Sequence, residues 1–107
     1  MKHTVHLVED AALDMTGIAR YIAERDSMER ALSVLAKIES LCDGLEESPS
    51  RGNYPPELHK MGITHFREIR FTPYRIIHEI VDEKVFVHCI LDGRRDMQSL
   101  LRRRLLR

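Results

Sequence analysis

Apolar and charged residues alternate most clearly between Phe66 and Ile77. Alternation with a period of two is typical of a β-strand with one buried face. Thr72-Pro73 interrupts the pattern, which indicates a tight turn between two strands. Strands are predicted over residues 63–71, 74–81 and 85–91. Because their connections are short, we expect a three-strand antiparallel meander.

Earlier in the chain the apolar residues recur every three or four positions, which is typical of amphipathic helices. A short strand over residues 3–8 comes first, and helices follow from Glu9 to about Glu24 and from Asp26 to about Glu46. Asp26 and Glu29 have the spacing of a capping box. The two apolar stripes are Ala12, Met15, Ile18, Ala19 and Ile22, then Ala31, Leu35, Ile38, Cys42 and Leu45. We expect an antiparallel helical hairpin that covers one face of the sheet; an oligomerisation module is the alternative.

The remaining segments complete an α+β fold. Residues 48–56 are rich in proline, glycine and serine, which favours an irregular connection. In residues 94–107, Met97, Leu101 and Leu105 have helical spacing and predict a short C-terminal helix. A chain of 107 residues is long enough to bury one core, so residues 1–107 are predicted to form a single domain.

The turn positions predict which residues share a face of the sheet. A loop at Thr72-Pro73 places Arg70 opposite Arg75, and a turn at Glu83-Lys84 would place Ile76 opposite Leu91. The face toward the helices would carry Ile69, Ile76, Ile80, Val87, Cys89 and Leu91. The opposite face would carry Arg70, Arg75, Asp92, Ile77, Ile90, Glu79, His88 and Phe86, and would be open for docking. Like charges on opposed strands need an anion, so an Arg75–Asp92 structural network is the alternative to a direct binding role.

Composition and charge narrow the function classes. The net charge is zero, but residues 1–60 hold 7 Lys and Arg against 11 Asp and Glu, and residues 61–107 hold 10 against 6. The second half is therefore basic and predicts a working surface. Two separated cysteines, a polar N-terminal segment without a signal-peptide pattern, and the lack of a long apolar run predict a cytoplasmic protein outside the membrane.

The six histidines do not have the spacing of a metal site, so no metal and no cofactor is expected. The predicted register places His88 opposite Glu79, where a hydrogen-bonded pair on the sheet surface is favoured over an acid/base couple. The arginine-rich C-terminal helix could contact phosphates. Direct nucleic-acid binding is nevertheless disfavoured, because the sequence shows no aromatic stacking platform beside those arginines.

The order of strand, helical hairpin, meander and short basic helix resembles the RelE/ParE superfamily of toxins from type II toxin-antitoxin systems. The resemblance covers nearly the whole chain and rests on six segments of sequence. They are Ile18-Ala19-Arg20-Tyr21-Ile22-Ala23, Pro49-Ser50-Arg51-Gly52 with Pro56-Glu57-Leu58, Arg67-Glu68-Ile69, Pro73-Tyr74-Arg75-Ile76-Ile77 and Asp92-Gly93-Arg94-Arg95-Asp96-Met97. The last segment looks more like the ParE branch.

The resemblance implies different chemistry for the two branches. RelE-type toxins cut messenger RNA on the ribosome with basic residues on the sheet and, typically, a C-terminal tyrosine. Arg75 and Arg95 match the arginines, but Leu101 stands near the tyrosine position. ParE-type toxins poison DNA gyrase without a hydrolytic site. The resemblance therefore favours a non-catalytic gyrase poison, with a ribosome-dependent endoribonuclease as the alternative.

The resemblance also implies a cognate ParD-like antitoxin whose acidic C-terminal segment folds onto the toxin. No catalytic residue is predicted under the favoured interpretation. The candidate residues for binding the antitoxin or gyrase are Arg67, Arg70, Arg75, Ile77, Phe86, Ile90, Arg94, Arg95, Arg102 and Arg103.

Overall fold

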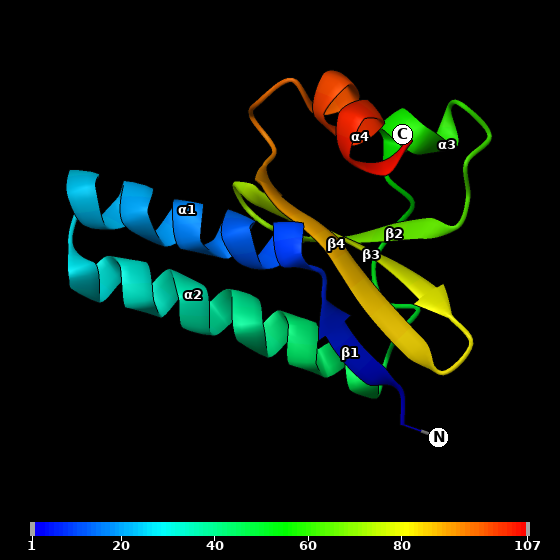
Figure 1. Ribbon diagram of the computed structural model, residues 1–107, viewed down its shortest axis with the longest axis horizontal. Helices are drawn as coiled ribbons and strands as arrows, with labels where there is room; N and C mark the ends of the chain where they lie inside the picture. Colours follow the sequence, from blue (N-terminus) through cyan, green and yellow to red (C-terminus); the bar gives the residue numbers. More distant parts are fainter. Residues whose placement is uncertain (1, 107) are drawn as a thin grey trace.

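Four strands form one sheet in the order β1-β4-β3-β2, with helices on both faces (Figure 1). The computed structural model describes residues 2–106. Its elements are β1 (Thr4–Leu7), α1 (Glu9–Arg25), α2 (Met28–Asp43), the 3-10 turn η1 (Gly44–Glu46), α3 (Pro56–His59), β2 (Phe66–Phe71), β3 (Tyr74–Val81), β4 (Lys84–Asp92) and α4 (Met97–Leu105). The predicted α+β fold, the helical hairpin, the antiparallel meander and the C-terminal helix are confirmed.

The sheet lies between two hydrophobic layers. On one face, α1 and α2 pack as an antiparallel hairpin against a cluster that includes Ile38, Ile76 and Val87. On the other face, α3 and α4 pack together over a second cluster built around Ile77 and Leu101 (Figure 1). Burial of apolar surface on both faces stabilises the sheet, and it leaves neither face fully open.

Two details of the helical hairpin differ from the sequence-based expectation. Ser27, not Asp26, caps α2, because its side chain accepts a hydrogen bond from the Arg30 amide at 3.0 Å. Ala11 is fully buried while Ala12 is exposed. The apolar stripe of α1 therefore begins one position earlier than predicted.

The first β-hairpin has the predicted register. Arg70 lies opposite Arg75, and Ile69 lies opposite Ile76. The second hairpin does not: its turn is formed by Asp82 and Glu83, and Ile76 pairs with Ile90 instead of Leu91. The turn lies one residue earlier than predicted because Asp82 adopts a positive φ of 55°, a conformation that aspartate tolerates better than most residues.

A β-bulge at His88 changes the faces of β4. Val87 pairs with His78, the next pair joins Cys89 to Ile77, and His88 is passed over. The extra residue lets both Val87 and Ile90 face α1 and α2, whereas the predicted alternation separated them. Cys89 and Leu91 move to the opposite layer, so the predicted face of each of these three residues (Cys89, Ile90 and Leu91) is wrong.

The predicted open sheet face is largely covered by α3 and α4, although Glu79, Phe86 and His88 on that face stay partly exposed. Ile77 and Ile90 are buried in the two opposite clusters, and Arg75 is only 6% exposed. α3 was not predicted, although Pro56 at its first position is compatible with a helix start.

Candidate functional site

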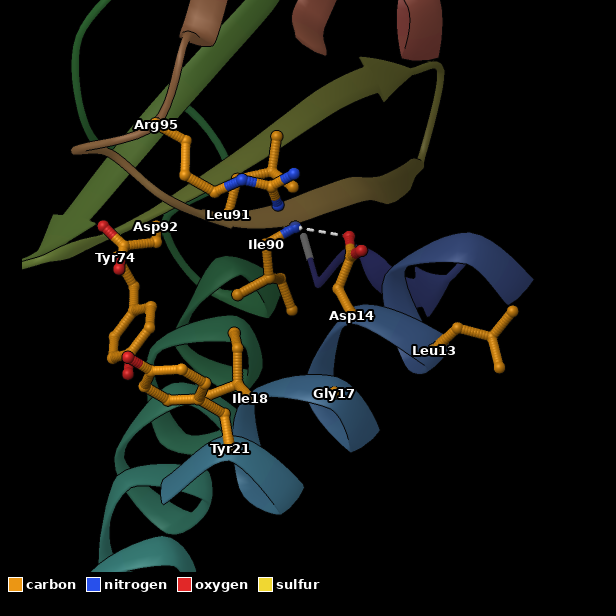
Figure 2. Close-up of a pocket in the computed structure, with 10 residues that line it drawn as sticks. All are labelled: Leu13, Asp14, Gly17, Ile18, Tyr21, Tyr74, Ile90, Leu91, Asp92 and Arg95. Atoms are coloured by element: carbon orange, nitrogen blue, oxygen red, sulfur yellow. Dashed lines mark hydrogen bonds between the residues drawn. The ribbon is translucent and has the colours of Figure 1, made fainter. Parts of the chain in front are cut away.

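A groove of about 440 Å³ runs between α1 and the end of the β3–β4 pair, and Figure 2 shows its lining. Its residues come from α1, from the facing ends of β3 and β4, and from the segment before α4. They are Leu13, Asp14, Gly17, Ile18, Tyr21, Tyr74, Ile90, Leu91, Asp92 and Arg95. Most of these side chains are apolar or aromatic, as is typical of a surface that receives a partner.

One wall of the groove is an exposed strip of α1. Leu13 is 61% exposed and Tyr21 is 54% exposed. Gly17 lies midway between them, and a spacing of four residues places all three on the same side of the helix. A Cβ atom at Gly17 would meet nothing within 4 Å. The strip therefore presents two large apolar side chains with a shallow gap between them.

The floor of the groove is closed by a polar link between three elements. Asp14 of α1 accepts a hydrogen bond from the Ile90 amide at 3.0 Å, and it also accepts two from Arg104 of α4, at 3.1 and 2.8 Å. The last paired residues of β1 and β4 are Leu7 and Val87, so the Ile90 amide lies beyond that pairing and Asp14 satisfies it. Hydrogen bonding to Asp14 raises the pKa of Arg104, and the link fixes α4 relative to α1.

Charges at the rim of the groove are unequally paired. Asp92 accepts two hydrogen bonds from the Arg94 side chain, and these lower the pKa of Asp92. Burial is the main cause that raises the pKa of Tyr74, and the nearby Asp92 adds to it. Arg95 makes no side-chain hydrogen bond or ion pair with residues 2–106. Its guanidinium is therefore available to an acidic partner.

Comparison with known families matches residues 5–97 to the family described as the ParE toxin of the type II toxin-antitoxin system, parDE. This chain belongs to the ParE toxin family. The match covers most of the chain and includes every groove residue. It confirms the ParE branch inferred from the sequence and identifies the protein as a ParE-type toxin.

Solved structures agree with the ParE assignment at the level of the fold. The chromosomal ParDE toxin-antitoxin system from P. aeruginosa matches with a TM-score of 0.71 and 14% identity, covering 83% of this chain and 94% of that chain. The toxin-antitoxin complex RelBE2 from Mycobacterium tuberculosis matches with a TM-score of 0.61 and 18% identity, covering 84% and 96%. A search of curated protein sequences finds no match.

In this ParE toxin, Arg75 belongs to a buried ion cluster. Its Nη1 and Nη2 atoms donate to the two carboxylate oxygens of Glu57 at 2.8 and 2.7 Å, and its Nε donates to Glu68. Arg70 donates to the other Glu68 oxygen at 3.2 Å. The bond from Arg75 lowers the pKa of Glu57, and the bond to Glu57 raises the pKa of Arg75. The predicted partner, Asp92, binds Arg94 instead, so the structural network exists with different carboxylates.

The remaining candidates from the sequence do not form one surface. Arg67 donates to the Gly52 carbonyl at 3.0 Å and lies 4.8 Å from the ring centre of Tyr54. Phe86 is half-buried on β4. Arg94, Arg95, Arg102 and Arg103 are exposed near or on α4. Of the predicted binding residues, only Arg95 lines the groove with an accessible side chain; Ile90 forms part of its floor.

Sequence reasoning missed the groove wall and the carboxylates that hold Arg75. The repeat of Leu13, Gly17 and Tyr21 could have revealed a second, exposed stripe on the first helix. Glu57 and Glu68 carry no such signal, because α3 brings them together across the fold. No metal-binding group of three or more ligands occurs among residues 2–106, and no helix within that range is long and apolar enough to span a bilayer.

Proposed function

We propose that this ParE-family toxin inhibits growth by binding DNA gyrase through a protein surface, and that a cognate antitoxin neutralises it by filling the groove between α1 and β4. The observation that carries the first part is the buried ion cluster. All three guanidinium nitrogens of Arg75 donate hydrogen bonds to the carboxylates of Glu57 and Glu68. An arginine held in this way is unsuited to stabilising the phosphate charge that develops during RNA cleavage.

The shape and charge of the groove support the proposal for the antitoxin. The gap at Gly17 admits a close backbone approach, as a helix or extended segment requires, and Leu13 and Tyr21 supply apolar contact on either side. Arg95 at the rim favours a carboxylate on the incoming segment. An acidic, amphipathic segment that folds on binding fits these features.

Parallel assays test the target. Purified toxin would be added to gyrase supercoiling and cleavage reactions and, separately, to translating ribosomes with end-labelled message. We expect loss of supercoiling with accumulation of cleaved DNA, and intact message. Codon-positioned cuts with normal supercoiling would overturn the gyrase proposal and favour the second candidate, a ribosome-dependent ribonuclease. That candidate is supported by the Glu79–His88 hydrogen bond of 2.9 Å, a pairing that proton transfer could use.

A matched pair of leucine variants tests the antitoxin site. Leu13 in the groove is 61% exposed and Leu32 on α2 is 58% exposed. Leu13→Asp introduces a carboxylate opposite an acidic partner, so we expect antitoxin affinity to fall about 100-fold. Leu32→Asp should leave affinity within about threefold. Titration calorimetry with the purified antitoxin measures both, and equal losses in the two variants would exclude the groove.

A further inference from the structure

A row of side chains crosses all four strands on the face away from α1 and α2. The register pairs His6 of β1 with Phe86 of β4, Phe86 with Glu79 of β3, and Glu79 with Phe66 of β2. Paired residues point to the same side of a sheet, and Phe66 belongs to the cluster beneath α3 and α4. His6, Phe86, Glu79 and Phe66 therefore lie in one line. We call these four residues, together with the neighbouring His88 and His65, the ring row.

The rings of this row are in continuous contact. The centres of His6 and Phe86 are 5.5 Å apart and the rings are stacked at 28°. His88 lies 6.4 Å from Phe86 and meets Phe66 edge-on at 5.5 Å. His65 then lies 4.3 Å from Phe66. The β-bulge places His88 within reach of Glu79, whose Oε1 is 2.9 Å from its Nε2.

Part of the ring row is open to the surface. Phe66 is only 4% exposed, but His6 is exposed, and Phe86 and His88 are partly exposed. A hollow of about 390 Å³ lies beside Phe86 and is lined also by the turn residues Val81 to Lys84. Phe86 is the ring that lines this hollow, and it belongs neither to the groove at α1 nor to the ion cluster around Arg75.

We propose that the open end of the ring row binds unpaired bases of single-stranded RNA or DNA. Bases stack on aromatic and imidazole rings, and each stacked base contributes substantially to affinity. Glu79 can accept a hydrogen bond from a base amino group, as carboxylates do with cytosine. Lys84, two residues from Phe86, can contact a phosphate. This inference does not depend on the gyrase target.

The charge around the hollow predicts how this binding differs from ordinary phosphate binding. Asp82 and Glu83 line the hollow together with Lys84, so electrostatic attraction for the backbone is small. Stacking then supplies most of the affinity, and affinity should depend only weakly on salt. Binding through the exposed arginines of α4 would instead show a steep salt dependence.

Fluorescence anisotropy with short labelled single-stranded RNA, single-stranded DNA and a duplex of the same sequence tests the proposal. We expect the single strands to bind and the duplex to bind at least about tenfold more weakly, because its bases are already stacked. Phe86→Leu keeps an apolar side chain but removes the ring, and should weaken single-strand binding about tenfold. His6→Gln, at an exposed position, provides a second test that does not disturb the core.

The control combines Arg102→Ala and Arg103→Ala, which removes two exposed charges of α4. It should change single-strand affinity by less than about threefold at physiological salt. Retained binding in both ring variants, together with loss in the arginine variant, would overturn the proposal. So would the absence of single-strand binding, or tighter binding to the duplex. Gyrase inhibition by the ring variants, measured in the same preparations, separates nucleic-acid binding from the proposed gyrase activity.

Discussion

The buried cluster around Arg75 and the groove at Arg95 use the same residue type in opposite ways. Arg75 has a side chain 7% exposed and is held by two carboxylates. Arg95 is exposed and makes no ion pair with the described part of the chain. The difference follows from the elements that pack near each arginine. Helix α3 places Glu57 against Arg75, whereas Arg95 lies at a groove with one side open to solvent.

This comparison separates residues that hold the toxin together from residues that can hold a partner. Both arginines belong to the basic second half of the chain, and their charge alone does not distinguish them. What distinguishes them is the number of carboxylates within hydrogen-bonding distance of each guanidinium. Variants that break the pairing of one region should therefore lower stability, and changes in the other region should alter binding with little loss of stability.

The largest effect is expected from Arg75→Ala. It leaves Glu68, which is 2% exposed, and Glu57 without their shared cation, and removing one partner of a buried ion pair costs about 3–5 kcal/mol. Urea denaturation measures the loss. Arg94→Ala is the control, because the Arg94 side chain is 72% exposed and solvent screens its ion pair with Asp92, so little stability should be lost. Similar losses in both variants would contradict the structural role of Arg75.

A smaller loss is expected from Arg104→Ala, which removes the link between α4 and the floor of the groove. The bonds to Asp14 join charged groups, so we expect about 1–3 kcal/mol. Arg102→Ala on the exposed side of α4 should stay within about 0.5 kcal/mol. A double-mutant cycle with Asp14→Ala isolates the pair, and a coupling energy near zero would show that Arg104 stabilises α4 in another way.

Gly17→Ala should raise the stability of the toxin and lower its affinity for the antitoxin. Glycine inside a helix is about 1 kcal/mol less favourable than alanine, and nothing crowds the new methyl group. The same methyl group fills the gap between Leu13 and Tyr21, so antitoxin affinity should fall while the melting temperature rises. Ser33→Ala, on the exposed side of α2, should also stabilise its helix without changing affinity. Unchanged affinity in Gly17→Ala would argue against close approach at this position.

The mildest effect concerns pH. His78 is fully buried, and burial lowers its pKa from the ordinary value of 6.5. Its contribution to stability is present above pH 6.5 and is lost as the pH falls, because the unfolded chain takes up the proton more readily. The lowered pKa of Glu57 adds a second loss below its ordinary value of 4.5. Urea denaturation at a series of pH values should show both losses of unfolding free energy. His78→Gln should flatten the first loss, whereas His59→Gln, at an exposed site, should not.

The sequence predicts the elements well and the residue partners less well. The register of the first hairpin follows from the period of two and from Thr72-Pro73, both of which are visible in the sequence. The second hairpin depends on the bulge at His88, which leaves an apolar pattern compatible with two registers. One inserted residue was enough to move Ile90 to the face of α1 and α2, and Cys89 and Leu91 to the opposite face.

The candidate site was less predictable for a related reason. Arg75 was correctly expected to need an anion, but Asp92 was the wrong one. The actual partner, Glu57, lies on α3, a short helix that the proline-rich sequence around it did not predict. Leu13 and Tyr21 were overlooked because the buried stripe of α1 accounts for its amphipathic pattern. Glu79, Phe86 and His88 were correctly placed on one face, but His6 could not be added to them, because only the sheet order brings β1 beside β4.

The two outer edges of the sheet are protected against pairing with other chains. Asn53 forms a bridge to Glu68 at the outer side of β2, with hydrogen bonds of 3.0 and 2.7 Å. Gly52 makes this possible, because it has a φ of +95° and a Cβ atom there would clash with the Glu68 carbonyl. The opposite edge strand, β1, is only four residues long. Short or covered edges resist edge-to-edge aggregation, so both outer strands of this sheet are protected against pairing with a second copy of the chain.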